Sequence, residues 1–232
     1  MGTDQLSLTK CLITVTAGVN VRDWHAVLKE LREHFDPYYD FILIPKVPLD
    51  TLDFTSYEMN LGSKMIIDAT KKTGRDAAYR PTVENPETQE VRSTDQDEAL
   101  TSYFRHLKSI DRHILDMNLV DETLLLVKVS RDGRAVVEKL VRHPKLHGLR
   151  IVAAVSEDVD IHSKESYIWG VFTRFDCERD VIFTEQKLVG ISPIYRGVMG
   201  IDATWKSGYP EPLVMKEEVV RRVDEKWGKI WK

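Results

Sequence analysis

Two short segments carry the same residue types in an order that suits anion binding at the end of a strand. Residues 68–71 (DATK) follow the apolar run 65–67, and residues 202–206 (DATWK) follow the apolar run 199–201. Ligands usually bind at the carboxyl ends of parallel strands, where a lysine and a threonine can hold a carboxylate or a phosphate. Aspartate and threonine side chains also close turns by hydrogen bonding to the backbone, which is the simpler explanation. The candidate substrate-facing or turn residues are Asp68, Thr70, Lys71, Asp202, Thr204 and Lys206.

A second pair of matching segments precedes these two. The step from Asn20 to Phe35 is 15 residues, and the step from Asp160 to Phe175 is also 15 residues. Matched spacing with matched residue types predicts a duplicated structural unit. Each copy of the unit ends at one of the two candidate turns.

The hydrophobic pattern predicts strands that alternate with amphipathic helices. Apolar runs typical of buried strands occur at residues 11–16, 41–44, 65–67, 123–129, 150–155 and 181–183. Apolar residues at helical spacing predict helices at residues 23–35, 134–142, 160–172 and 216–231. This alternation indicates an α/β fold with two related lobes, each a small, mostly parallel sheet with flanking helices.

The segment between the two lobes differs from them in composition. Residues 71–94 include two prolines and hardly any large apolar residue, which is typical of a linker or a long surface connection. An apolar stripe then predicts a long amphipathic helix at residues 96–116. We expect a first unit at 1–73 that lacks a leading strand and helix, a linker with the helix at 74–121, and a more complete second unit at 122–232.

Net charge and cysteine content bear on location and partners. The 232 residues include 33 basic and 37 acidic side chains, a formal net charge of -4, so no overall field attracts nucleic acid or an anionic membrane. Cys11 and Cys177 lie beside apolar runs, which fits buried free thiols better than a disulfide framework. Because the sequence shows neither an apolar run of membrane-spanning length nor a signal peptide, we expect a cytoplasmic protein.

Other polar residues are weaker candidates for chemistry. Asp160 lies in an acidic cluster that suits a hard cation, but its counterpart Asn20 has no acidic neighbours, so we expect turn and helix-cap roles at both positions. A proline separates His143 from His147, and no further ligand lies at zinc spacing, so no zinc site is expected there. A phosphate-binding glycine loop is also missing. We predict no catalytic, cofactor-binding or metal-binding residue in this chain.

The predicted helix at residues 216–231 has one apolar face and one charged face. Its apolar face carries Val223, Trp227, Ile230 and Trp231. An amphipathic terminal helix with two tryptophans suits docking to another lobe, another subunit or a partner. Packing on its own lobe is the alternative, and the sequence leaves both open.

Several segments in combination resemble a known family. The motifs DPYYD, LGSKMIIDATKK, TRFDCERD and MGIDATWK resemble the C-terminal domain of the UbiD family of reversible decarboxylases. Both copies of the unit match, at about residues 12–72 and 124–227. Members of this family use prenylated FMN to add or remove carbon dioxide on aromatic, heteroaromatic or α,β-unsaturated acids.

The resemblance implies a division of labour between two chains. In the family, an N-terminal and central region binds the cofactor and a metal ion and supplies the acid/base residues, and no stretch here matches that region. The resemblance therefore implies a structural or substrate-closing subunit that binds no cofactor alone and works with a larger UbiD-type catalytic subunit holding prenylated FMN, or a homo-oligomer. Two alternatives stay open: a stand-alone binding or assembly protein, and a self-sufficient decarboxylase with a site between the lobes that uses Asp68, Lys71, Asp202 and Lys206.

Overall fold

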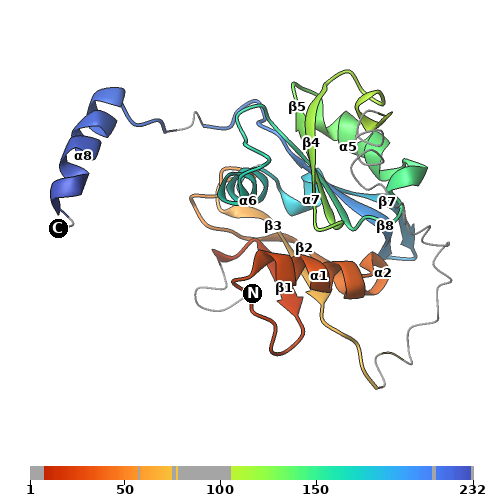
Figure 1. Ribbon diagram of the computed structural model, residues 1–232. Helices are drawn as coiled ribbons and strands as arrows, with labels where there is room; N and C mark the ends of the chain where they lie inside the picture. Colours follow the sequence, from red (N-terminus) through yellow and green to blue (C-terminus); the bar gives the residue numbers. More distant parts are fainter. Residues whose placement is uncertain (1–7, 57, 75–76, 78–105, 211–212, 231–232) are drawn as a thin grey trace, which may run out of the picture.

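The protein contains two β-sheets with helices between and outside them (Figure 1). The computed structural model describes residues 8–56, 58–74, 77, 106–210 and 213–230. The first sheet has the order β1 (Cys11–Val15), β3 (Leu61–Ala69), β2 (Phe41–Pro48). The second sheet has the order β4 (Ile114–Val120), β5 (Leu124–Val129), β6 (Ile151–Val155), β8 (Ser192–Ala203), β7 (Val181–Val189). The α/β class predicted from the sequence is confirmed.

The same arrangement of three strands occurs in both sheets. In the first sheet β1 runs parallel to β3, with Thr14 beside Asp68, and β2 runs antiparallel to β3. In the second sheet β6 runs parallel to β8, with Ala154 beside Asp202, and β7 runs antiparallel to β8. The register is therefore the same in both, and it places Asp68 and Asp202 at equivalent points near the ends of central strands.

Side-chain caps start the helices that follow β1 and β6. Asp23 accepts hydrogen bonds from two backbone N–H groups at the start of α1 (Trp24–His34), and Ser163 caps α6 (Lys164–Phe172) by accepting one, from Ser166. Each of these helices is followed by a short helix with an aspartate N-cap, which leads directly into the antiparallel strand. The two short helices are α2 (Pro37–Asp40) and α7 (Cys177–Asp180).

The structure corrects two details of the prediction. The sheets are mixed, because β2, β4 and β7 each run antiparallel to their neighbour. The predicted helix at 96–116 is wrong at its end, since Ile114–Val120 forms strand β4 and pairs with β5 across a tight turn at Asp121 and Glu122. The loop between the paired residues Val120 and Leu124 comprises Asp121, Glu122 and Thr123, and the first two of these have positive φ angles, 48° and 52°. Residues 96–105 of that predicted helix lie outside the described residues.

The second sheet is buried on both faces. Leu124 and Leu126 of β5 point into one hydrophobic core, and Leu125 and Val127 point into another, as the alternation of side chains along a strand dictates. Helix α5 (Gly133–Val141) packs in the second core, and α6 packs in the first. Figure 1 shows these two helices on opposite sides of the sheet.

The two units share one core and interlock. Met65 and Ile67 of the first sheet lie in the same cluster as residues of β5, β6 and β8. Helix α2 of the first unit contacts β8 of the second, and α7 of the second contacts β3 of the first. The space between the sheets is therefore filled by packed side chains.

The last described helix, α8 (Glu217–Ile230), lies apart from this core. Figure 1 shows it projecting from the body of the protein, and all of its residues are exposed. Its i,i+4 ion pairs, Arg222 with Glu218 at 3.2 Å and Arg221 with Glu225 at 4.0 Å, support it on the charged face. Among the described helices, none combines the length and the apolar composition that crossing a membrane requires.

Candidate functional site

The two DAT segments form the same closed turn at the carboxyl ends of β3 and β8. Oδ1 of Asp68 accepts hydrogen bonds from the backbone N–H of Thr70 at 3.0 Å and from its hydroxyl at 2.7 Å. Asp202 Oδ1 accepts the corresponding bonds from Thr204 at 3.1 and 2.6 Å. These bonds hold the backbone in a turn after the strand. The aspartates and threonines thus perform the turn role in both units.

A lysine four residues after each aspartate completes the turn, and in the first unit this is Lys72. Its Nζ donates to the carbonyl oxygens of Asp68 at 2.9 Å and Thr70 at 2.8 Å. Lys206 Nζ donates to the equivalent carbonyls of Asp202 at 2.8 Å and Thr204 at 3.3 Å. The structural counterpart of Lys206 is therefore Lys72, a residue that the sequence analysis did not select.

Each of these lysines also ties the strand end to the short helix of its own unit. Lys72 Nζ lies 3.2 Å from Oδ1 of the buried Asp40, and Lys206 Nζ lies 3.4 Å from Oδ2 of Asp180. An ammonium group has three donors, and its turn carbonyls together with these carboxylates offer acceptors for all three. An external anion at either lysine has to displace bonds made within the chain.

Lys71 occupies a different position from Lys72. Its backbone N–H donates to the hydroxyl of Thr16 at 2.8 Å, and the residue is exposed. The N–H of Trp205 donates to the hydroxyl of Ser156 at 2.7 Å, which is the equivalent bond in the second unit. The six predicted residues therefore gather at two separate turns, five of them through side-chain bonds and Lys71 through its backbone.

Burial, hydrogen bonds and the neighbouring lysines shift the pKa values of the aspartates at the turns. Burial by itself raises the pKa of Asp68, but the hydrogen bonds from Thr70 and the nearby Lys72 ammonium lower this pKa to about 2. Burial raises the pKa of Asp180, although Lys206 opposes that effect. Asp68 is consequently ionised at neutral pH and serves as an acceptor within the turn. A group with that pKa is a poor proton donor at neutral pH.

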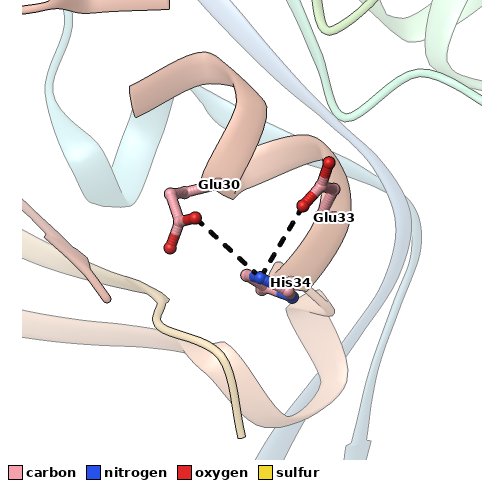
Figure 2. A group of neighbouring side chains, drawn as sticks. All are labelled: Glu30, Glu33 and His34. Atoms are coloured by element: carbon pink, nitrogen blue, oxygen red, sulfur yellow. Dashed lines mark ion pairs between the residues drawn. The ribbon is translucent and has the colours of Figure 1, made fainter. Parts of the chain in front are cut away.

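A group of ligand-type side chains that the sequence analysis did not select lies on α1. Glu30, Glu33 and His34 bring one oxygen or nitrogen atom each to within 4.8 Å of one another. Figure 2 shows both glutamates joined to His34 by ion pairs. Glu30 also accepts hydrogen bonds from the backbone N–H of Thr16 at 3.0 Å and from the Thr16 hydroxyl. The signal available in the sequence was the spacing i, i+3, i+4 on one helix, which places all three on one face.

The loop positions Asn20 and Asp160 both lie in turns. Asn20 Oδ1 accepts from the N–H of Arg22 at 3.1 Å, and Asp160 Oδ1 accepts from the N–H of His162 at 2.9 Å. These are side-chain turns that precede a helix. The predicted turn roles are confirmed, but the predicted helix-cap roles are wrong, because Asp23 and Ser163 are the N-caps of the helices that follow.

A shallow hollow of 330 Å³ lies where α1 meets the β4–β5 turn. His25, Arg32, Asp121 and Glu122 line it, together with Lys29. His25 Nδ1 lies 2.7 Å from Asp121, and Arg32 lies 3.0 Å from Glu122. His25 and Arg32 thus pair with side chains of the β4–β5 turn, whereas Lys29 pairs with Glu33 on its own helix.

The predicted interface helix presents an apolar stripe to solvent. Trp227 is 58% exposed and Ile230 is 63% exposed, and Val223 lies on the same face. The fourth predicted interface residue, Trp231, lies outside the described residues. The alternative that this helix packs on its own lobe is not seen for Glu217–Ile230.

Two mixed sheets with flanking helices and matching strand-end turns define the class of this protein as an α/β domain. Residues 1–69 and 100–203 match the family described as the 3-octaprenyl-4-hydroxybenzoate carboxy-lyase C-terminal domain. The chain belongs to this family, the C-terminal domain of the UbiD decarboxylases, and the resemblance stated from the motifs is confirmed.

Individual relatives match to different extents. The chain is 25% identical over 228 residues to a 4-hydroxybenzoate decarboxylase subunit of Chlamydia pneumoniae, covering 98% of this chain and 35% of that protein. It is 45% identical over 78 residues to an uncharacterized protein of Archaeoglobus fulgidus, covering 34% of this chain and 16% of the relative. Vanillic acid decarboxylase of Sedimentibacter hydroxybenzoicus in its closed form is similar with a TM-score of 0.42 at 20% identity, covering 56% of this chain and 31% of that one. The chain thus spans about a third or less of each of these relatives.

Proposed function

We propose that this chain is a subunit of a reversible decarboxylase or carboxylase complex that acts on aromatic or unsaturated acids. In this proposal it has a structural or substrate-closing role, and a larger UbiD-type chain supplies prenylated FMN and the acid/base residues. Family membership supports the proposal, as does the relative named a decarboxylase subunit. The observation that carries it lies at the two strand-end turns. Their lysines and aspartates bond to groups within the chain and so do not form a catalytic acid/base pair.

The helix end beside the Asp202 turn does not fit the phosphate of a flavin. A phosphate site at the end of a parallel sheet normally uses the N-terminus of a neighbouring helix. Here Gly133 opens α5 directly against the side chains of Asp202 and Thr204. The carboxylate of Asp202 already lies at that helix end, and a second anion there would be repelled.

The exposed face of α8 is the surface that we assign to the catalytic partner. Its apolar stripe runs through Val219, Val220 and Val223 to Trp227 and Ile230, all of them exposed. Aromatic and aliphatic side chains of this kind form the buried centre of protein interfaces. Charged residues flank the stripe and keep the helix soluble until it docks.

The test is affinity purification of the tagged chain from its native source. The eluate is analysed by mass spectrometry and by the near-ultraviolet and visible absorbance that a bound flavin gives. The variants Val223→Asp and Ile230→Asp place a charge in the apolar stripe. The matched control, Arg221→Ala, changes the charged face of the same helix.

The proposal predicts that a larger UbiD-type chain and a flavin coelute with the wild-type protein and the control, and that both stripe variants lose them. A homo-oligomer that elutes alone and without flavin absorbance supports the binding-protein alternative instead. Turnover of an aromatic acid by the purified chain alone supports a self-sufficient enzyme.

A further inference from the structure

Three ligand atoms on the last two turns of α1 surround one point in space (Figure 2). His34 Nε2 lies 3.9 Å from Glu30 Oε1 and 3.9 Å from Glu33 Oε2. These separations are too long for hydrogen bonds. A cation with bonds of about 2.1 Å joins two ligand atoms that are up to about 4.2 Å apart, so both separations suit a shared ion.

Glu30 is held in place for such a role by a neighbouring strand end. Its Oε2 accepts from the N–H of Thr16 at 3.0 Å and from the Thr16 hydroxyl, which leaves Oε1 directed at His34. Outer hydrogen bonds of this kind orient metal ligands. Burial by itself raises the pKa of Glu30, but the hydrogen bonds from the Thr16 hydroxyl and N–H bring it below its usual value. The carboxylate is therefore ionised and oriented at neutral pH.

Exposure of the three side chains allows an ion to enter. Glu30 is 12% exposed and His34 is 20% exposed, whereas Glu33 is 42% exposed at the rim. Glu33 uses its other oxygen, Oε1, for a long ion pair with Lys29 at 4.0 Å. Such an exposed pair contributes little, so Glu33 is able to turn fully toward an ion.

The second unit shows that the fold does not require these residues. Alignment on Phe35 and Phe175 places Gly170, Thr173 and Arg174 at the positions of Glu30, Glu33 and His34. Arg174 forms a two-bond ion pair with Asp158, at 2.9 and 2.6 Å. Ser156 accepts the turn N–H, as Thr16 does, with no glutamate at the position of Glu30. The glutamates and histidine are thus an addition to the shared architecture of the first unit.

We propose that Glu30, Glu33 and His34 bind one divalent cation of the zinc class, with water completing its coordination. An imidazole nitrogen with two carboxylate oxygens suits zinc and similar transition metals better than calcium or magnesium, which take oxygen ligands. Through Thr16, which also accepts the Lys71 N–H, the ion stabilises the junction between α1 and the DAT turn of the first unit.

The test uses the full chain without an affinity tag, stripped of metal by a chelator and titrated with zinc chloride by calorimetry. Cobalt(II) chloride serves as a second probe, because its visible absorbance reports the ligand field of the bound ion. The variants are His34→Asn, Glu30→Gln and the exposed Glu33→Gln. His162→Asn is the matched control, because His162 also faces a carboxylate, Asp116 at 3.3 Å, away from this cluster.

We expect one zinc ion per chain, an affinity at least tenfold lower in His34→Asn and in either glutamine variant, and an unchanged affinity in the control. Circular dichroism establishes that each variant is folded, and Glu33→Gln, which alters an exposed side chain, decides the matter if Glu30→Gln is unfolded. Absence of stoichiometric zinc binding to the wild-type chain overturns the proposal. If folded His34→Asn or Glu33→Gln binds zinc as tightly as the wild type, the proposal is also overturned, because the ion then lies elsewhere.

Discussion

Asp176→Ala should destabilise the protein far more than the equivalent substitution in the other unit, Asp36→Ala. Asp176 is 1% exposed, and its Oδ1 accepts from the N–H groups of Glu178 at 3.1 Å and Arg179 at 3.0 Å. Its Oδ2 accepts from the hydroxyl of Ser63, in the other unit, at 2.9 Å. One carboxylate thus caps α7 and joins the two units.

The expected magnitude follows from these bonds. Loss of a helix N-cap costs about 1 kcal/mol, and loss of a buried hydrogen bond to a charged group costs about 2 kcal/mol more. Asp36 is only half-buried and caps α2 through one bond, to the N–H of Tyr38 at 3.0 Å. We therefore expect a decrease in the free energy of unfolding of about 3 kcal/mol for Asp176→Ala and about 1 kcal/mol for Asp36→Ala.

Urea unfolding followed by tryptophan fluorescence and circular dichroism measures both values. With a slope of about 3 kcal/mol per M, the midpoint falls by roughly 1 M for Asp176→Ala and roughly 0.3 M for Asp36→Ala. A double-mutant cycle with Ser63→Ala isolates the bond between the units, and we expect a coupling of about 1 to 2 kcal/mol. Equal costs for the two alanine variants, or a coupling near zero, would refute this reasoning.

Three further predictions concern the turns and the core. Because the pKa of Asp68 is low in the folded protein, its ionised side chain contributes about 1 kcal/mol to the free energy of unfolding, after allowance for solvent screening. This contribution is present above pH 4 and is lost as the pH falls toward 2. Asp68→Asn should therefore flatten this part of the curve of stability against pH, and an unchanged curve contradicts the assignment. Lys72→Met should lower the free energy of unfolding by about 2 to 3 kcal/mol, because it leaves a buried carboxylate of α2 without this cation. Lys71→Met should change it by less than about 0.5 kcal/mol. Thermal melts of both variants compare the two losses of stability. Gly200→Ala should cost about 1 to 3 kcal/mol, because a Cβ there meets valine side chains of α5; a melting temperature equal to that of the wild type shows that α5 moves away.

Comparison of one unit with the other was the most informative guide in the sequence to the strand ends and their turns. The strands that end at Asp68 and Asp202 follow from their apolar runs, and the equal spacing places them at equivalent points of two sheets. Alignment of DATKK with DATWK would have identified Lys72 as the counterpart of Lys206. The lysine nearest the aspartate was chosen instead, and only the geometry shows which of two adjacent lysines faces the turn.

Strand β4 shows where local pattern fails. Leu107, Ile110 and Ile114 recur at helical spacing, yet Ile114 begins a strand. The hairpin at Asp121 and Glu122 brings this segment onto β5, and the backbone pairing with β5 outweighs the helical spacing of the apolar residues. Antiparallel pairing of β2 and β7 was missed for a similar reason, because short apolar runs do not reveal strand direction.

The α1 cluster was missed because polar residues at helical spacing can be either a solvated face or a set of ligands. Glu30 and Glu33 share the polar face with Lys29, and polar faces of this kind are usually solvated. Only the structure shows that Thr16 fixes one carboxylate of this face toward His34.

The central claim is that this chain works as a subunit and does not catalyse alone. The most direct test removes its gene from the source organism and measures carbon dioxide released from aromatic acids, 4-hydroxybenzoate among them, in cell extracts. Our account predicts that the activity disappears, that purified wild-type chain restores it, and that the purified chain alone has none. Full activity without this chain, or turnover by the chain alone, would contradict the account.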